Sequence, residues 1–189
     1  ALVTDERASA HIHGIDPIDE GTIRDLGAAY DGAVRTADRV TGEILDLLGR
    51  QGLLGNAVVA VCGDHGENLG EHGDLNHLMS VREPVLHVPL VIRWPGRLEG
   101  GRVEDAEVRL QDVYPTLLAA ARVAMPANCG KDATSLLESP LRPRTLVAEY
   151  GPALGLIGKA GKAVPNAPRT PFDRYREALL AVRAPASAP

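Results

Sequence analysis

An Asp and a His stand side by side directly after an apolar run in the segment VVAVCGDHGENLGEHGDLNH, residues 58–77. Gly63 and Gly66 flank Asp64 and His65, and glycines allow tight turns and the close approach of a ligand. A carboxylate beside a neutral imidazole suits Mn, Zn or Fe, and suits Ca or Mg less, because those two ions prefer oxygen. The pair therefore predicts metal binding, with a polar turn after a strand as the alternative interpretation.

Two more histidines, His72 and His77, follow within the same segment. Two ligands alone do not complete a metal site, so the later histidines matter to the interpretation. They either return to the same pocket or cap the loop. The spacing D-H-G-x-x-x-G-x-H-G, residues 64–73, is far harder to obtain by chance than D-H-G alone.

The elements around this loop predict an α/β fold. Apolar residues at intervals of three and four predict an amphipathic helix over 20–50, and glycines at 49, 52 and 55 supply the turn that ends it. Residues 56–62 are predicted as a short buried strand, because Val58, Val59 and Val61 belong to a continuous apolar run of the kind found in parallel sheets. Asp64 follows the end of this strand by two residues, and ligands bind beyond the carboxyl ends of strands in open α/β sheets.

The rest of the chain adds fewer elements. We predict strands over 88–94 and 145–150, and a helix over 110–122 in which Pro115 sits in the first turn or causes a kink. Residues 1–19 show no sustained period, and the Gly- and Pro-rich sequence from 151 predicts a loop or arm. The segment EALLAVR, 177–183, is predicted as one more strand or a helix end.

The composition excludes several functions. With a formal net charge of −5, the chain lacks the basic face that phosphate-backbone binding needs, and only 3% aromatic residues leave little for base stacking. We therefore expect no nucleic-acid partner. No apolar stretch approaches the roughly 18 residues of a membrane span. At 189 residues, the length favours one domain.

Three motifs in order carry a family resemblance. D-H-G-E-N-L-G-E-H-G occupies 64–73, H-V-P-L-V-I-R-W-P-G occupies 87–96, and D-V-Y-P-T-L-L occupies 112–118. Together with the preceding long helix they resemble the sulfatase family of the alkaline phosphatase superfamily, over residues 20–150. The resemblance implies an α/β alkaline-phosphatase-like three-layer sandwich with a mostly parallel sheet, here incomplete. It does not specify the substrate beyond a small anionic ester.

The same resemblance implies roles for particular residues. Asp64 and His65 match an Asp followed by His or Asn that ligates a divalent metal in the family, and we expect Ca or Mn there. A Lys or His after this loop contacts the substrate sulfate or its leaving oxygen. His77 is the best match for this catalytic position, and His72 is the second.

Other features of the family lack a clear match. An upstream histidine is expected, for which His11 and His13 are the candidates. The nucleophile of sulfatases is a formylglycine made from the Cys or Ser of C/S-x-P-x-R, and neither Cys62 nor Cys129 has this context. Two early acidic metal ligands are also missing. We therefore expect this chain to be the C-terminal part of a catalytic domain, and we expect the formylglycine in an N-terminal segment that is missing from it.

These considerations lead to one prediction and two alternatives. Residues 1–150 are predicted to be a partial sulfatase-like catalytic domain, and 151–189 a Gly/Pro-rich arm with the truncated start of a C-terminal subdomain. The function is predicted as metal-assisted hydrolysis of a sulfate ester. The alternatives are a phosphonate or phosphodiester hydrolase or phosphoethanolamine transferase of the same superfamily, and a non-catalytic truncated paralogue. An isolated chain should expose apolar surface and therefore be poorly soluble or form oligomers.

Overall fold

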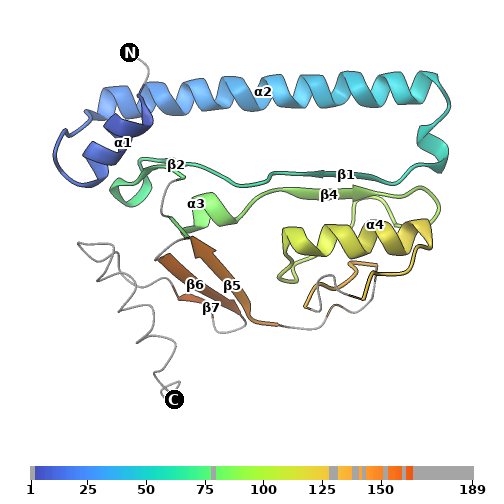
Figure 1. Cartoon of the computed structure of the whole chain (residues 1–189). Coiled ribbons are helices and arrows are strands. Elements are labelled where there is room, and N and C mark those ends of the chain that lie inside the picture. Colours follow the sequence, from blue (N-terminus) through green and yellow to red (C-terminus); the bar gives the residue numbers. More distant parts are fainter. Residues whose placement is uncertain are drawn as a thin grey trace.

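The computed structural model describes residues 3–77, 80–127, 132–137, 141, 144–150, 153–158 and 161–163. A long helix lies along one side of a two-stranded sheet, and a shorter helix lies on the opposite side (Figure 1). These are α2, Glu20–Arg50, the strands β1, Val59–Cys62, and β4, Leu90–Arg93, and α4, Val113–Ala121. No described helix is both long and apolar enough to cross a membrane.

A helix near the start of the chain is a correction to the expected irregular segment. This helix, α1, spans Asp5–Ile12, and the side chain of Thr4 accepts a hydrogen bond from the backbone N–H of Arg7. A threonine cap and two acidic residues in the first turn stabilise the free N–H groups there. The helix has only one buried residue, Ala8, which explains why hydrophobic periodicity does not reveal it.

The predicted long helix is confirmed as α2. Its N-cap is Asp19, whose side chain accepts from the backbone N–H of Thr22 at 2.9 Å. Ile23 and Leu26, near its start, pack against a small core made by Ala8, Ile18 and Leu75. None of the helix's own residues is buried, and residues 28–40 are all exposed.

The strand after this helix is confirmed, but the mostly parallel sheet is wrong for the described residues. β1 pairs antiparallel with β4, with Val59 opposite Arg93 and Cys62 opposite Leu90. A parallel neighbour requires a crossover, usually through a helix that covers the sheet. Between the two strands, the described residues contain only one short α-helix, the four-residue α3, Glu83–Leu86. The chain therefore returns beside β1 in the opposite direction.

The loop between β1 and β4 folds back on itself. Its short strands β2, Asn68–Leu69, and β3, Leu75–Asn76, pair antiparallel around the 3₁₀ turn η2, Glu71–Gly73. Gly70 has φ 110°, and a Cβ there would lie 2.7 Å from Cγ2 of Ile23. The loop therefore packs directly against the start of α2, and β3 contacts α1.

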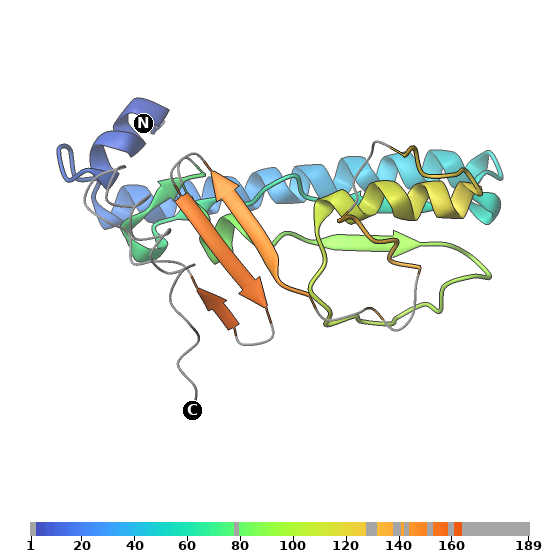
Figure 2. The ribbon, with the colours of Figure 1, turned by 60° about the horizontal axis from the view of Figure 1, so that its bottom comes forward.

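The C-terminal half confirms the predicted helix and third strand. The 3₁₀ turn η3, Leu110–Asp112, leads into α4, with Pro115 in the first turn as predicted. β5 spans Leu146–Tyr150. Where the sequence predicts a loop, β6, Ala153–Gly158, and β7, Gly161–Ala163, complete an antiparallel sheet with β5. Figures 1 and 2 both place this sheet near α3. The strand or helix end predicted over 177–183 lies outside the described residues.

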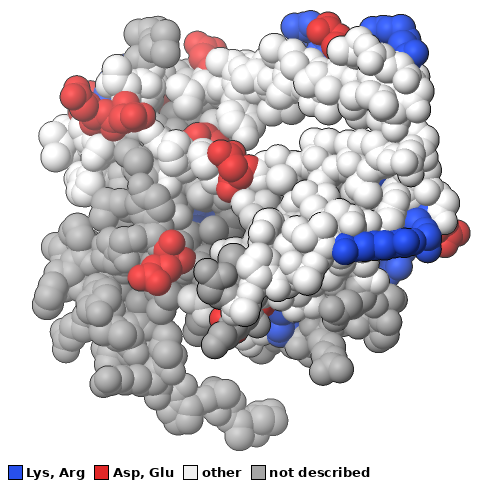
Figure 3. Space-filling model, turned by 45° about the vertical axis from the view of Figure 1, so that its right-hand side comes forward, with Lys and Arg blue, Asp and Glu red and all other residues white. Residues whose placement is uncertain are grey.

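An exposed apolar surface lies on α2 and on the β1–β4 sheet. Tyr30, Val34 and Ile44 share one face of the helix, since they recur at helical spacing, and all three are exposed. Val61 and Val91 stand directly opposite each other across the two strands and are exposed too. Figure 3 shows a hollow between the helix and the sheet whose visible walls carry few charged side chains.

Candidate active site in the loop after β1

Asp64 and His65 lie in the turn that follows β1, as predicted. Asp64 is exposed, and its Oδ1 accepts the backbone N–H of His65 at 3.0 Å. This hydrogen bond lowers the pKa of Asp64. The side chain is therefore held as a carboxylate, which is the form that ligates metals.

The ring of His65 is oriented by a hydrogen bond to the backbone. Its Nδ1 lies 2.9 Å from the carbonyl oxygen of Gly66. A carbonyl can only accept a hydrogen bond, so Nδ1 carries the proton in this contact, and the lone pair of the neutral ring is on Nε2. Metal-ligating histidines commonly donate their second ring N–H to a backbone carbonyl in this way.

His77 lies beside His65, as expected if the later histidines return to the same pocket rather than cap the loop. Its ring centroid lies 4.3 Å from that of His65, with the ring planes tilted by 37°. Its Nδ1 lies 3.1 Å from Oε2 of Glu67. The structure therefore brings the predicted metal pair and the predicted catalytic histidine together at the carboxyl end of β1.

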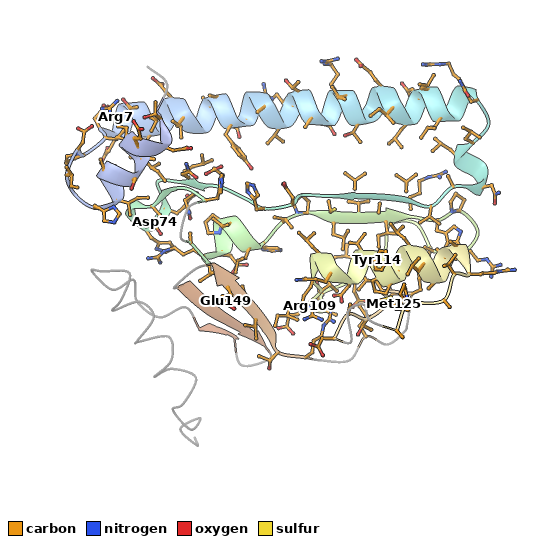
Figure 4. All side chains as sticks on the ribbon, in the orientation of Figure 1. Arg7, Asp74, Arg109, Tyr114, Met125 and Glu149 are labelled. Carbon is orange, nitrogen blue, oxygen red and sulfur yellow. The ribbon has the colours of Figure 1, made fainter. Side chains whose placement is uncertain are left out.

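The backbone of His77 is also held in place. Its N–H donates to Oδ1 of Asn76, a residue with φ 67°, at 2.5 Å. Asn76 donates through Nδ2 to Asp5 at 2.6 Å, and its carbonyl accepts Nδ2 of the buried Asn68 at 2.6 Å. Nearby, Asp74 on the same loop pairs with Arg82 at 2.5 Å, and Figure 4 shows Asp74 at the end of the molecule that holds α1 and Arg7.

The other predicted histidines are placed differently. His72 is exposed on η2 in a left-handed conformation, with φ 60°, and no contact with His65 or His77 is present among the described residues. His11 accepts the backbone N–H of Ile18 through Nδ1 at 2.8 Å, and Nδ1 of His13 lies 2.7 Å from the carbonyl of Ser9. Both upstream histidines therefore support the turn after α1.

The donor set fits a divalent metal in kind, although it is small. Asp64 offers a carboxylate and His65 an imidazole nitrogen, and a hydrogen bond to the backbone orients each of these side chains. Within the described ranges, no group of three or more His, Cys, Asp or Glu side chains is arranged to hold a metal. Among these residues, the loop therefore brings together the two predicted ligands and no third one.

Two residues of the site are not found by sequence reasoning. Glu67 and Asn76 contact His77, from ten residues and one residue away. Glu67 lies inside the D-H-G-E motif, so its acidic side chain next to the metal pair was a visible signal. The pairing of β2 with β3, which closes the loop and brings Glu67 to His77, has no counterpart in hydrophobic periodicity because each strand has only two residues.

Comparisons with known proteins show which family the chain resembles. Residues 5–123 match the family described as Sulfatase. The chain is 40% identical to arylsulfatase K of Xenopus laevis over 112 residues, which are 59% of this chain and 20% of that protein. It is 31% identical to the multifunctional alkaline phosphatase superfamily protein PehA of Trinickia caryophylli over 136 residues, or 69% of this chain and 26% of that protein.

A solved structure gives the same relationship in three dimensions. The structure of BT4656 in complex with its substrate D-glucosamine-2-N,6-O-disulfate superimposes with a TM-score of 0.57 and 25% identity, and the match covers 66% of this chain and 28% of that one. The chain spans about a fifth of the length of the arylsulfatase K relative. With a family match over more than half of its residues, this chain belongs to the sulfatase family.

Proposed function

We propose that this chain is part of a metal-dependent sulfuric ester hydrolase and carries one side of its active site. The observation that supports the proposal is the 4.3 Å contact between the rings of His65 and His77. It joins a residue expected at the metal to a residue expected at the leaving oxygen. The family match and the disulfated substrate named for BT4656 support an anionic sulfate ester as the substrate class.

Each side chain has a distinct task in this proposal. Asp64 and His65 hold a divalent metal, Ca or Mn, through a carboxylate oxygen and through Nε2. When bound, the metal supplies the positive charge that polarises the ester oxygens. His77 holds a proton at Nε2 and gives it to the leaving oxygen, which would otherwise depart as an unstable anion. His72 is the second candidate for that position, and its exposed place on η2 makes it the weaker one.

The nucleophile belongs to residues outside this sequence in our proposal. No C/S-x-P-x-R motif occurs in the 189 residues. Cys62, at the end of β1, is a free and exposed thiol without that context. We therefore propose a formylglycine in another segment of the active enzyme, together with the remaining acidic metal ligands.

A second candidate function is hydrolysis of a phosphonate or phosphodiester at the same site. The similarity to PehA, named as a multifunctional member of the alkaline phosphatase superfamily, favours it over the remaining alternatives. A tetrahedral sulfate and a tetrahedral phosphonate present similar oxygens to a metal and a histidine. Ligand binding can separate these two chemistries without any turnover.

Calorimetry on the full chain tests the proposal, with Mn, Ca and Zn titrated in turn. We expect weak binding in the wild type, since the remaining ligands are proposed to lie in another segment, and a further loss of roughly tenfold or more in affinity in Asp64→Ala, because the variant removes one of only two ligands. Asp38→Ala, which removes an exposed carboxylate from α2, is the matched control and should bind as the wild type does. Binding that survives Asp64→Ala unchanged would contradict the proposed metal site.

The metal-loaded chain then distinguishes the two substrate classes. Inorganic sulfate and methylphosphonate are titrated separately, with His77→Gln as the variant. Tighter binding of sulfate, weakened in the variant, is expected from a sulfatase site. Preference for methylphosphonate would favour the second candidate function.

A further inference from the structure

The contact between Glu67 and His77 determines which ring nitrogen of this histidine is available. Oε2 of Glu67 lies 3.1 Å from Nδ1, and the two side chains are only 23% and 38% exposed. An ionised carboxylate accepts hydrogen bonds and cannot donate them. The proton of a neutral His77 therefore sits on Nδ1, and the lone pair is on Nε2.

The carboxylate depends on this contact in return. Oε1 of Glu67 is buried and has no hydrogen-bond partner among the described residues. A buried oxygen without a partner loses its hydration and gains nothing for it. The bond from His77 to the second oxygen is thus the main compensation for the burial of Glu67 within the described part of the chain.

Other contacts limit how the ring can move. The ring of His65 lies against that of His77, and the side chain of Asn76 holds the backbone N–H of His77. Asn76 is fixed in turn by Asp5, which belongs to α1. Contacts therefore hold Nδ1 of the ring, one side of the ring and the backbone N–H of His77.

We propose that Glu67 is a positioning residue that keeps His77 in the Nδ1–H form and presents Nε2 to the substrate. The inference rests on the proposed function in one respect, since it takes the ester's leaving oxygen as the group that meets Nε2. In the reaction, the ring with protons on both nitrogens gives its Nε2 proton to the leaving oxygen as the ester bond breaks, while Nδ1–H stays bonded to Glu67. The ring then returns to the neutral Nδ1–H form that Glu67 favours.

The chain contains a matched pair for comparison. Nδ1 of His87 lies 3.1 Å from Oε1 of Glu83, which is the same distance, but these side chains are 79% and 60% exposed. Contacts between exposed charged groups contribute little because water competes for both partners. His87 therefore serves as an internal reference in any measurement on the histidine rings.

Nitrogen-15 spectra of the histidine rings test the inference on the full, uniformly labelled chain. They are recorded with a chelator present and at about pH 8, where an ordinary imidazole is neutral. His77→Gln identifies the signals of His77. We expect the Nδ1–H form in the wild type and in Glu67→Gln, because the amide carbonyl can still accept the bond.

Glu67→Leu removes the acceptor, and the ratio of Nδ1–H to Nε2–H should fall by roughly tenfold or more, the factor that a hydrogen bond to a charged group supplies. His87 should stay unchanged. Glu67→Asp, which withdraws the carboxylate by one methylene, should shift the ratio in the same direction and covers the case in which Glu67→Leu does not fold. An Nε2–H form in the wild type, or a ratio that neither Glu67→Leu nor Glu67→Asp alters, would overturn the inference.

This outcome is independent of the proposed metal site. The spectra are recorded without metal, so a failure of calorimetric binding leaves them unaffected. Conversely, an unchanged tautomer ratio in the Glu67 variants can occur beside intact metal binding. A negative result in the spectra can therefore be told apart from a negative result in the calorimetry.

Discussion

Arg144 donates to both carboxylate oxygens of Asp112, which lies 32 residues earlier in the chain and is completely buried. The backbone N–H groups of Arg109 and Thr134 also donate to this carboxylate, at 2.7 and 3.0 Å. Figure 4 shows Arg109 beside the start of α4, the helix that carries Tyr114. The pairing therefore joins the start of α4 to the residues just before β5.

Removal of Arg144 should destabilise the chain strongly. Arg144→Ala leaves the buried charge of Asp112 with backbone donors and the more distant Arg109, whose nitrogen is 4.0 Å away. Loss of one partner of a buried ion pair costs about 3–5 kcal/mol. Urea unfolding of the wild type and the variant measures this difference.

The control for that variant is an exposed pair. Arg102 and Glu104 lie 2.5 Å apart but are 53% and 42% exposed. Arg102→Ala should change the free energy of unfolding by less than about 1 kcal/mol. Similar losses in the two variants would mean that burial does not govern the strength of the Asp112 pair.

The same carboxylate predicts a dependence of stability on pH. Burial acts to raise the pKa of Asp112, but the hydrogen bonds from Arg144, Thr134 and Arg109 outweigh it and lower the pKa below its usual value. A lowered folded-state pKa adds stability above the unfolded value of about 4, and this stability is lost as the pH falls through the folded value.

Urea unfolding of the wild type and Asp112→Asn at several pH values measures this effect. The amide cannot ionise, so the wild type should exceed the variant in stability at pH 6, and the gap should narrow steadily below about pH 4. A gap that stays constant down to pH 2.5 would contradict the assignment.

Gly66→Ala should disturb the candidate site through sterics alone. A Cβ at Gly66 would collide with the carbonyl oxygen of Pro84, and the N–H of Gly66 donates to the carbonyl of Val85 at 2.8 Å. Relief of the collision requires the loop to move away from α3, at a cost of about 1–3 kcal/mol. The midpoint temperature of thermal unfolding and the calorimetric affinity for Mn should both decrease.

Gly27→Ala is the matched control for that substitution. Gly27 lies in α2, and a Cβ there meets nothing within 4 Å. Alanine is the better helix former by about 1 kcal/mol, so this variant should be more stable than the wild type. If both alanine variants behaved alike, close approach would not explain the glycine after His65.

The exposed apolar surface on α2 and the β1–β4 sheet should cause self-association of the 189-residue chain. Tyr30, Val34 and Ile44 on the helix and the facing pair Val61 and Val91 on the sheet are all exposed. Apolar patches of this kind mark association sites in soluble proteins. Sedimentation velocity should show oligomers that increase with protein concentration.

Charged substitutions on this surface provide the check. Ile44→Glu together with Val91→Glu should shift the distribution toward monomer. Arg39→Glu, which changes an exposed residue of α2 paired with Glu43 at 2.5 Å, should not. A wild-type chain that stays monomeric at all concentrations would contradict this prediction.

The sequence predicts those elements whose own side chains define them. α2 begins and ends where its periodicity does, at Glu20 and Arg50, and β1, β4, α4 and β5 all fall within their predicted ranges or begin beside them. The hydrophobic pattern does not predict α1, because its residues are mostly polar. Thr4 followed by Asp5 and Glu6 is a capping signal that could have revealed this helix. The division at residue 150 stays a prediction.

Strand direction and partners depend on contacts that a single sequence does not display. The apolar run of β1 is typical of a parallel strand, yet its neighbour is the antiparallel β4. Similarly, β6 contains Gly155 and Gly158 and reads as a loop, but pairing with β5 makes it a strand. In the site, Asp64 and His65 were found because they are adjacent, whereas the contact of Glu67 with His77 depends on how the loop closes.

The long helix α2 makes its most extensive contacts with the rest of the described chain near its ends, at β2 close to its start and at η1, Leu54–Asn56, after its last turn. Between these contacts, residues 28–40 are all exposed, so water reaches most of the surface around their backbone hydrogen bonds. Such a segment can open locally without unfolding the remainder. Amide hydrogens in the middle of α2 should therefore exchange with solvent deuterium sooner than those near Ile23, and any molecule that covers this stretch will be recognisable by the protection that it restores.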